Sequence, residues 1–345
     1  MIGNKYKVSI AMATYNGSMY IKEQLLSFCT QSLPPHEVVI CDDCSTDNTI
    51  KIIEELSHTL PYKVKIIKNS SNLGSTIQDG YGITFSIAAK HCTGDFIFFS
   101  DQDDVWYPNK IEQHLKIFES NPNIDFITSR ADEVDENLNK INQKSHANCN
   151  EFITGKFVRG CCSSGRKSFF QNILPIPKGC SHDWWCTICA CSLNKFYETN
   201  EKLQAYRIHG KQTSLYYSKN KKSFFQRLQH SIEAYTKDIE YISIKKELKL
   251  WNNKLAGFTC FYEKLKKQNL LTDEAYMYFQ KINDKYNLLS LRNELRNLSF
   301  FKRMKLAKNN FILYKKESDL FRATKYLCKD IFAPSIAKIL YSWQK

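Results

Sequence analysis

The first 130 residues alternate between short runs rich in β-branched residues and longer segments with apolar residues at helical spacing. This alternation is typical of a parallel sheet flanked by helices, because each parallel strand needs a crossover before the next one. It predicts a doubly wound α/β fold. The expected strands are Val8–Ala13, Glu37–Cys41, Lys63–Lys68, Asp95–Ser100 and Asp125–Thr128, with helices at about 21–31, 48–56, 75–90 and 109–119.

A change in composition divides the rest of the chain. Segments at Arg166–Leu174, His182–Ser192 and a strand-like Gln204–Ile208 complete the α/β part. After about Ser214 the chain has segments of helical period, rich in Lys, Leu, Tyr and Asn, with almost no Gly or Pro. We therefore predict a catalytic domain at residues 1–215 and an α-helical extension at residues 216–345.

The positive charge of the chain lies in that extension. The chain has 49 Lys and Arg against 35 Asp and Glu, and residues 211–345 hold 28 against 12 of these. Such a basic region favours an anionic partner, either membrane lipid or nucleic acid. Apolar residues interleaved with Lys and Arg favour helices lying on an anionic membrane surface, and the stretches Phe300–Lys308 and Ile331–Trp343 are the best candidates for this contact. The alternative is an ordinary helical subdomain with solvated basic faces.

Thirteen cysteines raise the possibility of a disulfide framework or a metal site. The chain runs from Met1 into a strand-like segment without a charged and then apolar signal sequence, so we expect a reducing cytoplasm. No apolar run reaches the roughly 18 residues of a spanning helix, so we expect none. Cys186 and Cys189 are spaced like one of the two ligand pairs of a zinc site, but no second pair follows them. The cysteines are therefore expected to be buried thiols rather than zinc ligands.

Polar residues follow the expected strands. Ligands bind at the carboxyl ends of strands in an open parallel sheet, so these residues are candidates for a binding site. They are Thr14-Tyr15-Asn16-Gly17, Asp42-Asp43-Cys44-Ser45-Thr46-Asp47, Asn72-Leu73-Gly74 and Asp101-Gln102-Asp103-Asp104.

Two of these segments suggest specific chemistry. Asp101 and Asp103 lie two residues apart after an apolar strand, and their carboxylates repel each other unless a cation or a proton joins them. A divalent cation bound by carboxylates and a diphosphate is typically Mg²⁺ or Mn²⁺. Asp42 and Asp43 could accept the imide N–H of uracil or thymine, with Tyr15 near the base. The alternative for both segments is capping of the helix that follows.

Six motifs, taken in order, resemble those of family 2 glycosyltransferases with the A-type (GT-A) fold, in particular bacterial rhamnosyltransferase-like members. The resemblance covers about Val8–Gln212. The motifs are A-T-Y-N-G (13–17), D-D-C-S-T-D (42–47), N-L-G (72–74), T-G-D-F-I-F-F-S-D-Q-D-D-V-W-Y-P-N-K (93–110), H-D-W-W (182–185) and Y-R-I-H-G (206–210). Cys44 and Gln212 depart from the family pattern, where Gly and Asn are common.

The resemblance implies a Rossmann-like nucleotide-diphospho-sugar transferase domain with a mixed, mainly parallel sheet. It also implies roles for individual residues. The donor-binding residues would be Thr14, Tyr15, Asp42, Asp43, Asn72, Gly74, Asp101 and Arg207. The metal ligands would be Asp101, Asp103 and His209, and the catalytic base Asp183. Trp184 and Trp185 would flank the acceptor sugar; the alternative is that they are core aromatics beside a helix-capping Asp183.

The implied reaction is the transfer of a sugar, with rhamnose as one donor sugar, from a UDP or dTDP donor to a hydroxyl of a glycan or lipid-linked glycan. One direct displacement would invert the anomeric centre. The reaction would belong to cell-surface polysaccharide synthesis and would take place at the cytoplasmic face of the membrane. A nucleotidyltransferase would usually show a Gly-rich phosphate loop near the first strand, which A-T-Y-N-G lacks. A nucleic-acid-binding protein would leave the acidic motifs unexplained, so we expect no nucleic-acid partner.

Overall fold

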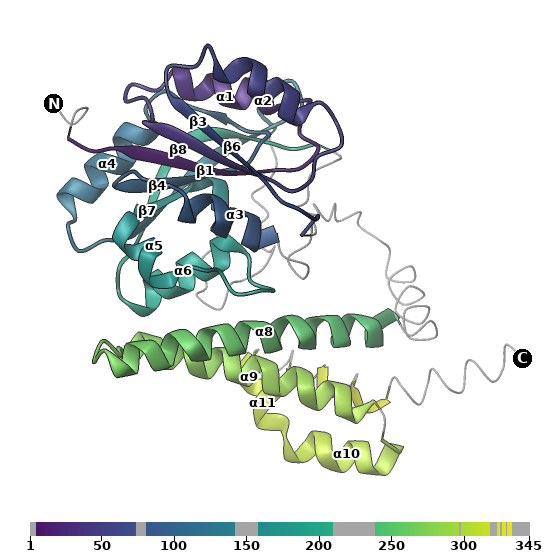
Figure 1. Cartoon of the computed structure of the whole chain (residues 1–345). Coiled ribbons are helices and arrows are strands. Elements are labelled where there is room, and N and C mark those ends of the chain that lie inside the picture. Colours follow the sequence, from purple (N-terminus) through teal and green to yellow (C-terminus); the bar gives the residue numbers. More distant parts are fainter. Residues whose placement is uncertain are drawn as a thin grey trace, which may run out of the picture. The chain divides into compact units, whose positions relative to one another are not determined.

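Figure 1 shows the computed structural model, which describes residues 5–73, 81–141, 158–209, 239–296, 298–317, 323–324, 326–328 and 330–332. The chain forms two compact units. The first comprises Met1–Ser214 together with Phe261–Tyr278, and the second comprises Leu215–Cys260 and Phe279–Lys345. The predicted boundary at residue 215 lies outside the described residues and stays a prediction.

The first unit contains an eight-stranded sheet with the order β3-β2-β1-β4-β7-β6-β8-β5. Strands β3, β2, β1 and β4 run parallel, and β6 and β8 also pair in parallel. Strand β7 is antiparallel to β4 and to β6, and β5 is antiparallel to β8. This mixed, mainly parallel sheet confirms the predicted fold class. The strands are β1 Val8–Thr14, β2 Glu37–Asp42, β3 Lys63–Lys68, β4 Phe96–Ser100, β5 Val105–Trp106, β6 Phe126–Val134, β7 Ser163–Arg166 and β8 Phe196–Arg207.

Helices cover both faces of this sheet (Figure 1). Their bounds are α1 Ile21–Cys29, α2 Thr49–Ser57, α3 Tyr81–Lys90, α4 Lys110–Ser120, α5 Lys167–Ile173 and α6 His182–Ser192. Apolar residues of α1, α2 and α4 form one core with β1, β2 and β4. On the other face, Phe85 of α3 and Phe170 of α5 pack edge-on against Phe99 of β4. Residues on both faces of β4 are therefore buried, which explains its continuous apolar sequence.

The turn between two long helices also belongs to the first unit. Helix α8 spans Ile239–Lys267 and α9 spans Asp273–Leu295. The ring of Phe261 packs against Trp185 of α6 with a centroid distance of 6.0 Å. Lys264 Nζ donates a hydrogen bond to the carbonyl of Asn172 at 2.7 Å, and the Thr272 hydroxyl donates to the carbonyl of Ser192. The first unit is therefore discontinuous in the sequence.

The second unit is helical, as predicted for the extension. It contains the remainder of α8 and α9, with α10 at Phe300–Asn309 and α11 at Phe311–Glu317. The buried Arg303 donates hydrogen bonds to the carbonyls of Leu295, Leu298 and Ile331 at 3.1, 2.8 and 2.8 Å. Arg303 thereby pairs carbonyl groups at the end of α9, where the helix offers no partner. In the part of the chain that the structure describes, no helix has the length and apolar character to span a bilayer.

Candidate active site

The carboxyl ends of β1 and β2 are joined by the carboxylate of Asp42. The parallel register places Thr14 opposite Asp42, and the Thr14 hydroxyl donates to Asp42 Oδ1 at 2.7 Å. The amide of Ser45 donates to Asp42 Oδ2 at 2.8 Å, and the Ser45 hydroxyl donates to Oδ1 at 2.6 Å. Asp42 is buried and has three protein donors, so in this structure it holds the strand ends together.

Asp43 has a different environment. Its Oδ1 accepts hydrogen bonds from Asn69 Nδ2 at 2.9 Å and from the amide of Leu73 at 2.8 Å. Asn72 Nδ2 donates to the carbonyl of Asp43 at 2.9 Å, which brings the segment after β3 to the end of β2. No described residue donates to Asp43 Oδ2, so this oxygen can accept a hydrogen bond from a ligand. The predicted donor-binding residue Gly74 lies outside the described residues.

The loops after β1 and β4 are held together by Gln102. Its Oε1 accepts a hydrogen bond from the amide of Tyr15 at 2.9 Å, and its Nε2 donates to the carbonyl of Tyr15 at 3.0 Å. A Cβ atom at Gly17 would lie 2.2 Å from Gln102 Oε1, so the loop approaches this side chain more closely than any other residue type allows. The side chain of Tyr15 is 41% exposed and is available to a ligand.

The structure brings together Asp103 and His209, two of the three predicted metal ligands. His209 Nε2 lies 2.8 Å from Asp103 Oδ2, and the Tyr20 ring packs against the His209 ring at a centroid distance of 4.8 Å. Burial and the neighbouring Asp103 raise the pKa of Asp101 to about 7, and Asp183 adds to this increase. Asp101 is therefore close enough to both carboxylates for their charges to act on it.

Asp104, which belongs to the candidate D-Q-D-D segment but was given no role of its own, is fully buried. Its Oδ2 accepts a hydrogen bond from Gln204 Nε2 at 2.8 Å, and its Oδ1 accepts one from the amide of Arg207 at 3.1 Å. Burial and the adjacent Asp103 raise the pKa of Asp104 well above its usual value. Its place directly after Asp103 in D-Q-D-D was the available sequence signal.

The donor atoms at this edge fit a hard divalent cation. Among the described residues, one group of side chains has ligand atoms close enough to share an ion: Asp101, Asp104 and Cys161, whose atoms lie within 4.8 Å of one another. Both oxygens of Asp104 already accept protein hydrogen bonds, and Cys161 Sγ accepts one from Gln204 Nε2 at 3.2 Å. Asp101 belongs to this group, while Asp103 pairs with His209 outside it. The negative charge of Asp103 acts on Asp101, and carboxylate oxygens of this kind are ligands that Mg²⁺ or Mn²⁺ prefers.

Arg207 makes framework contacts in this structure. Its Nε donates to the carbonyl of Asp103 at 2.8 Å, and its terminal nitrogens donate to the carbonyl of Glu136 and the carboxylate of Glu23. The guanidinium carbon also lies 4.6 Å from the centre of the Tyr20 ring, and the side chain is 2% exposed. These contacts fix the main chain around Asp103. A direct contact of Arg207 with the donor stays a prediction.

Asp183 lies in the first turn of α6, after the N-cap residue Ser181. Its Oδ1 accepts a hydrogen bond from the amide of Trp184 at 2.7 Å, and the side chain is half-buried. Its negative charge contributes to the raised pKa of Asp101. The role of Asp183 as the base stays a prediction.

The two tryptophans after Asp183 are core residues in this structure. Trp184 is 1% exposed and Trp185 is 3% exposed. Trp185 Nε1 donates to the carbonyl of Ile173 at 2.9 Å, and its ring packs against Phe261. An acceptor sugar would need an exposed ring face, so the burial favours core packing over the predicted acceptor contact. The neighbouring Cys186, Cys189 and Cys191 are buried, form no disulfide bond, and lie outside the group of possible ligands found among the described residues.

His182, which directly precedes Asp183, is a buried core residue. Its ring stacks on Phe85 at a centroid distance of 3.8 Å and meets the edge of Phe99 at 4.8 Å. A Cβ atom at Gly160 would lie 1.8 Å from His182 Nε2, so glycine is required there for the ring to fit. Burial lowers the pKa of His182 to about 4, and the ring is therefore neutral at pH 7.

Comparison with known proteins gives three relevant matches. The chain is 28% identical over 218 residues to an uncharacterized glycosyltransferase of Nostoc sp., covering 59% of this chain and 65% of that protein. It is 38% identical over 104 residues to the dTDP-rhamnosyl transferase RfbG of Shigella flexneri, covering 30% of this chain and 35% of that protein. The matched stretches thus span about a third to two thirds of these relatives.

The crystal structure of S. aureus TarS 1–349 in complex with UDP superposes with a TM-score of 0.55 at 17% identity, covering 98% of this chain and 92% of that chain. At this identity the likeness concerns the fold. The family model described as "Glycosyl transferase family 2" matches residues 9–174, which include β1 to β4 and the D-Q-D-D segment. This part of the chain is therefore a glycosyltransferase domain of family 2, and its fold is GT-A.

Proposed function

We propose that the protein is an inverting, metal-dependent glycosyltransferase of cell-surface polysaccharide synthesis. It moves a sugar from UDP or dTDP to a hydroxyl of a glycan or lipid-linked glycan. The observation that carries this proposal is the pairing of Asp103 with His209 at 2.8 Å, together with the raised pKa of Asp101, to which the charges of Asp103 and Asp183 both contribute. Residues far apart in the sequence thus form one polar site at the carboxyl edge of β4.

The nucleoside binds at the ends of β1 and β2. Asp43 Oδ2 is the acceptor for the imide N–H of uracil or thymine, because Asp43 Oδ1 is already used by Asn69 and Leu73. The half-exposed Tyr15 ring provides a surface for the base. Asp42 supports this pocket from below through Thr14 and Ser45. A dTDP or UDP donor is supported by the relative RfbG, a dTDP-rhamnosyl transferase, and by the structure of TarS in complex with UDP. RfbG makes rhamnose the first sugar to test.

The diphosphate binds over Asp101, Asp103 and His209. A bound Mg²⁺ or Mn²⁺ would stabilise the negative charge that develops on the leaving nucleoside diphosphate. Asp103 is held for this role from two sides, by His209 at its carboxylate and by Arg207 at its main-chain carbonyl. These contacts fix the carboxylate before the donor arrives, which reduces the cost of ordering it on binding.

Asp183 takes the proton of the acceptor hydroxyl. As the acceptor oxygen bonds to the anomeric carbon, the bond from that carbon to the diphosphate breaks, and the nucleoside diphosphate departs with the electron pair. The O–H proton moves to the Asp183 carboxylate, whose Oδ1 is oriented by the Trp184 amide at 2.7 Å. Attack from the side opposite the leaving group inverts the anomeric centre.

The proposal is tested by incubating the protein with UDP-, dTDP- and GDP-sugars, with Mn²⁺ or Mg²⁺, and measuring release of the nucleoside diphosphate. We expect release from one UDP or dTDP donor, lost on chelation and restored by metal. Asp103→Asn should remove the metal-dependent part of donor binding. The matched control is Asp95→Asn, since Asp95 precedes the opposite end of β4 and accepts a hydrogen bond from the amide of Lys7 at 2.9 Å. Release from no donor would overturn the proposal.

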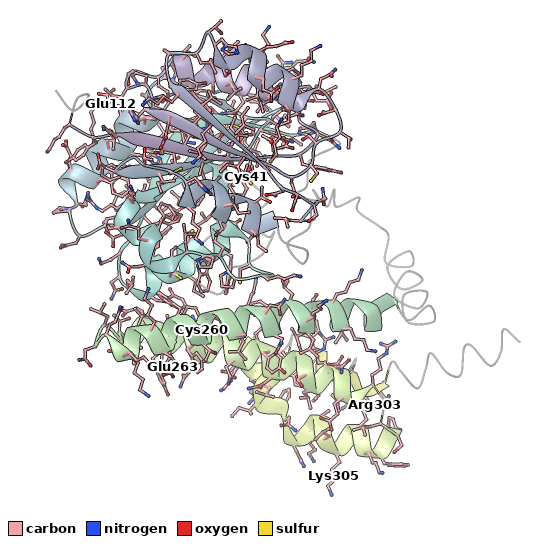
Figure 2. The ribbon with its side chains drawn as sticks, viewed as in Figure 1. Cys41, Glu112, Cys260, Glu263, Arg303 and Lys305 are labelled. Carbon is pink, nitrogen blue, oxygen red and sulfur yellow. The ribbon has the colours of Figure 1, made fainter. Side chains whose placement is uncertain are left out.

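We also propose that the second unit binds the anionic inner face of the cytoplasmic membrane, where a lipid-linked acceptor would be found. On α10, Phe301 is 77% exposed and Met304 is 40% exposed. The exposed residues Lys302, Lys305 and Lys308 surround them, and Figure 2 shows Lys305 pointing away from the helix. Exposed apolar side chains with flanking lysines are the pattern of helices that lie in a membrane surface.

Vesicle sedimentation tests this surface. Replacing Lys302, Lys305 and Lys308 by Gln should weaken binding to phosphatidylglycerol vesicles and leave binding to phosphatidylcholine vesicles unchanged. The control replaces three exposed lysines of α8, at positions 245, 246 and 249, which changes the net charge equally. Point substitutions are preferable to truncation, because removing residues 222–345 would also remove Phe261–Tyr278 from the first unit. Equal binding by both variants would refute the proposed surface.

A further inference from the structure

A chain of buried hydrogen bonds connects helix α4 to the Asp103–His209 pair. We propose that Lys110 and Gln204, which do not reach the ligand, are positioning residues that set the geometry of the metal and diphosphate site. This inference rests on the proposed function. Lys110 is the last residue of the D-Q-D-D-V-W-Y-P-N-K segment, and the inference assigns it a role in positioning the metal ligands rather than in contacting the donor.

This network of hydrogen bonds begins at Lys110, the first residue of α4, whose side chain is fully buried. Its Nζ donates hydrogen bonds to the carbonyl of Cys161 at 2.7 Å and to Gln204 Oε1, and it lies 3.7 Å from the centre of the Trp106 ring. Gln204 passes the connection on, because its Nε2 donates to Asp104 Oδ2 at 2.8 Å. The amide of Gln204 therefore lies between the buried amine of Lys110 and the buried carboxyl group of Asp104.

Asp104 connects the network of hydrogen bonds to the site in two ways, through Asp103 and through Arg207. It is bonded covalently to Asp103, and its Oδ1 accepts a hydrogen bond from the amide of Arg207 at 3.1 Å. Arg207 Nε returns to the carbonyl of Asp103 at 2.8 Å, and two residues further His209 meets Asp103 Oδ2 at 2.8 Å. Asp104 thus fixes the spacing between the loop after β4 and the end of β8, which carry the two halves of the metal site.

A buried network of this kind is not explained by stability. Two buried charges have desolvation costs that their attraction roughly offsets, and well-packed apolar residues of the same volume usually stabilise a core as well. What the network supplies is orientation, since the donors of Lys110 and Gln204 are directed at fixed buried acceptors. Partners that orient metal ligands in this way typically contribute about 10- to 100-fold to metal affinity.

Helix α4 contains a matched control one turn further on. His114 is also fully buried, and its Nδ1 lies 2.7 Å from the Ser164 hydroxyl of β7. This hydrogen bond does not lead to Asp104. His114→Leu therefore removes a buried polar contact from the same face of the same helix without breaking the proposed chain.

The decisive variants exchange the two ends of the Gln204–Asp104 hydrogen bond. Gln204→Glu keeps an acceptor for Lys110 but places a carboxylate against Asp104, where it had a donor. Adding Asp104→Asn restores the pair with donor and acceptor reversed, and the pair again contains one carboxyl group and one amide, as in the native protein. The side-chain oxygen that Asp104→Asn leaves in place can still accept from the Arg207 amide. A generic effect on core packing would not be reversed by the second substitution.

The experiment measures Mn²⁺ affinity of the full-length, UDP-saturated or dTDP-saturated protein by calorimetry, with metal-free nucleotide affinity and the melting temperature as separate readouts. We expect Gln204→Glu and Lys110→Met to weaken Mn²⁺ binding about 10- to 100-fold. Metal-free nucleotide binding should change less than about twofold, because the base site at Asp43 is separate. The double variant should recover most of the Mn²⁺ affinity, and His114→Leu should retain it while lowering the melting temperature.

Two outcomes would overturn the inference alone: native Mn²⁺ affinity in folded Gln204→Glu and Lys110→Met, or an equal loss in His114→Leu. If Gln204→Glu does not fold, the comparison of Lys110→Met with His114→Leu decides. If the native protein shows no metal-dependent nucleotide binding, the proposed function fails and the inference fails with it. Metal-dependent nucleotide binding by the native protein therefore distinguishes a failure of the inference from a failure of the proposed function.

Discussion

Replacing Asp183 by Asn tests the catalytic base with little structural disturbance. The Trp184 amide donates to Asp183 Oδ1 at 2.7 Å, and the side-chain oxygen of Asn can accept the same hydrogen bond. Asn is as good as Asp near a helix start, so stability should change by less than about 1 kcal/mol. An amide cannot accept the acceptor's proton. Loss of general-base assistance should slow transfer about 10²- to 10⁴-fold, which corresponds to about 3–5 kcal/mol of activation free energy.

The assay measures initial rates of sugar transfer at saturating donor, together with donor and Mn²⁺ affinity by calorimetry. Both affinities should stay within a few fold of the native values, since Asp183 is not a predicted donor or metal ligand. The rate of the variant should rise at high pH, where more of the acceptor is ionised. A transfer rate near that of the native protein, with an unchanged melting transition, would refute the assignment of Asp183 as the base.

Three further predictions concern stability. Burial lowers the pKa of His182 to about 4 in the folded protein. The pKa of a histidine in the unfolded chain is about 6.5, so the unfolded state binds more protons below that pH. The free energy of unfolding should therefore fall by about 2 kcal/mol from pH 7 to pH 5 because of this residue. Urea unfolding at both pH values should show a smaller fall in His182→Gln, and equal falls would contradict the pKa. Gly160→Ala should destabilise the first unit by about 1–3 kcal/mol, because its Cβ would lie 1.8 Å from His182 Nε2; an unchanged melting temperature would show that the ring moves aside freely. Arg303→Met should cost the second unit about 3 kcal/mol by leaving three carbonyls without their donor, with Arg303→Lys intermediate in urea titration.

The sheet could be predicted where short runs rich in β-branched residues mark its strands. The expected strand at Lys63–Lys68 is confirmed residue for residue, and those starting at Val8 and Glu37 are each one residue longer than predicted. The pattern missed β7, Ser163–Arg166, because its small polar residues carry no alternation. Its stability comes from antiparallel pairing on both sides, with β4 and β6, which no local pattern reveals.

Longer elements show the same limit. Strand β6 continues from the expected Asp125–Thr128 segment to Val134, and β8 begins at Phe196 rather than near Gln204. Polar residues, some buried and some exposed, interrupt these extensions, so they lack the apolar run that marked the shorter predictions. Their pairing in parallel, with two register shifts, holds them in the sheet. The first residues of the helix expected at 75–90 lie outside the described residues.

The site could be predicted as a set of residues but not as a set of contacts. Motif resemblance selected Asp103 and His209, and the structure places them together across 106 residues of sequence. It could not show that Arg207 is used in framework contacts, since those partners come from α1 and from the loop after β6. Lys110 was part of a quoted motif, but its role depends on burial against Gln204, which only the folded chain establishes.

The contact between Gly17 and Gln102 has a consequence for the history of such proteins. Position 17 has no room for a Cβ atom as long as Gln102 bridges the two loops, and Gln102 makes both its hydrogen bonds to Tyr15 only if the chain at Gly17 stays close. A substitution at either position alone should be selected against. In a set of descendants of a common ancestor, the two positions should therefore change together or remain unchanged together, although 85 residues separate them in the sequence.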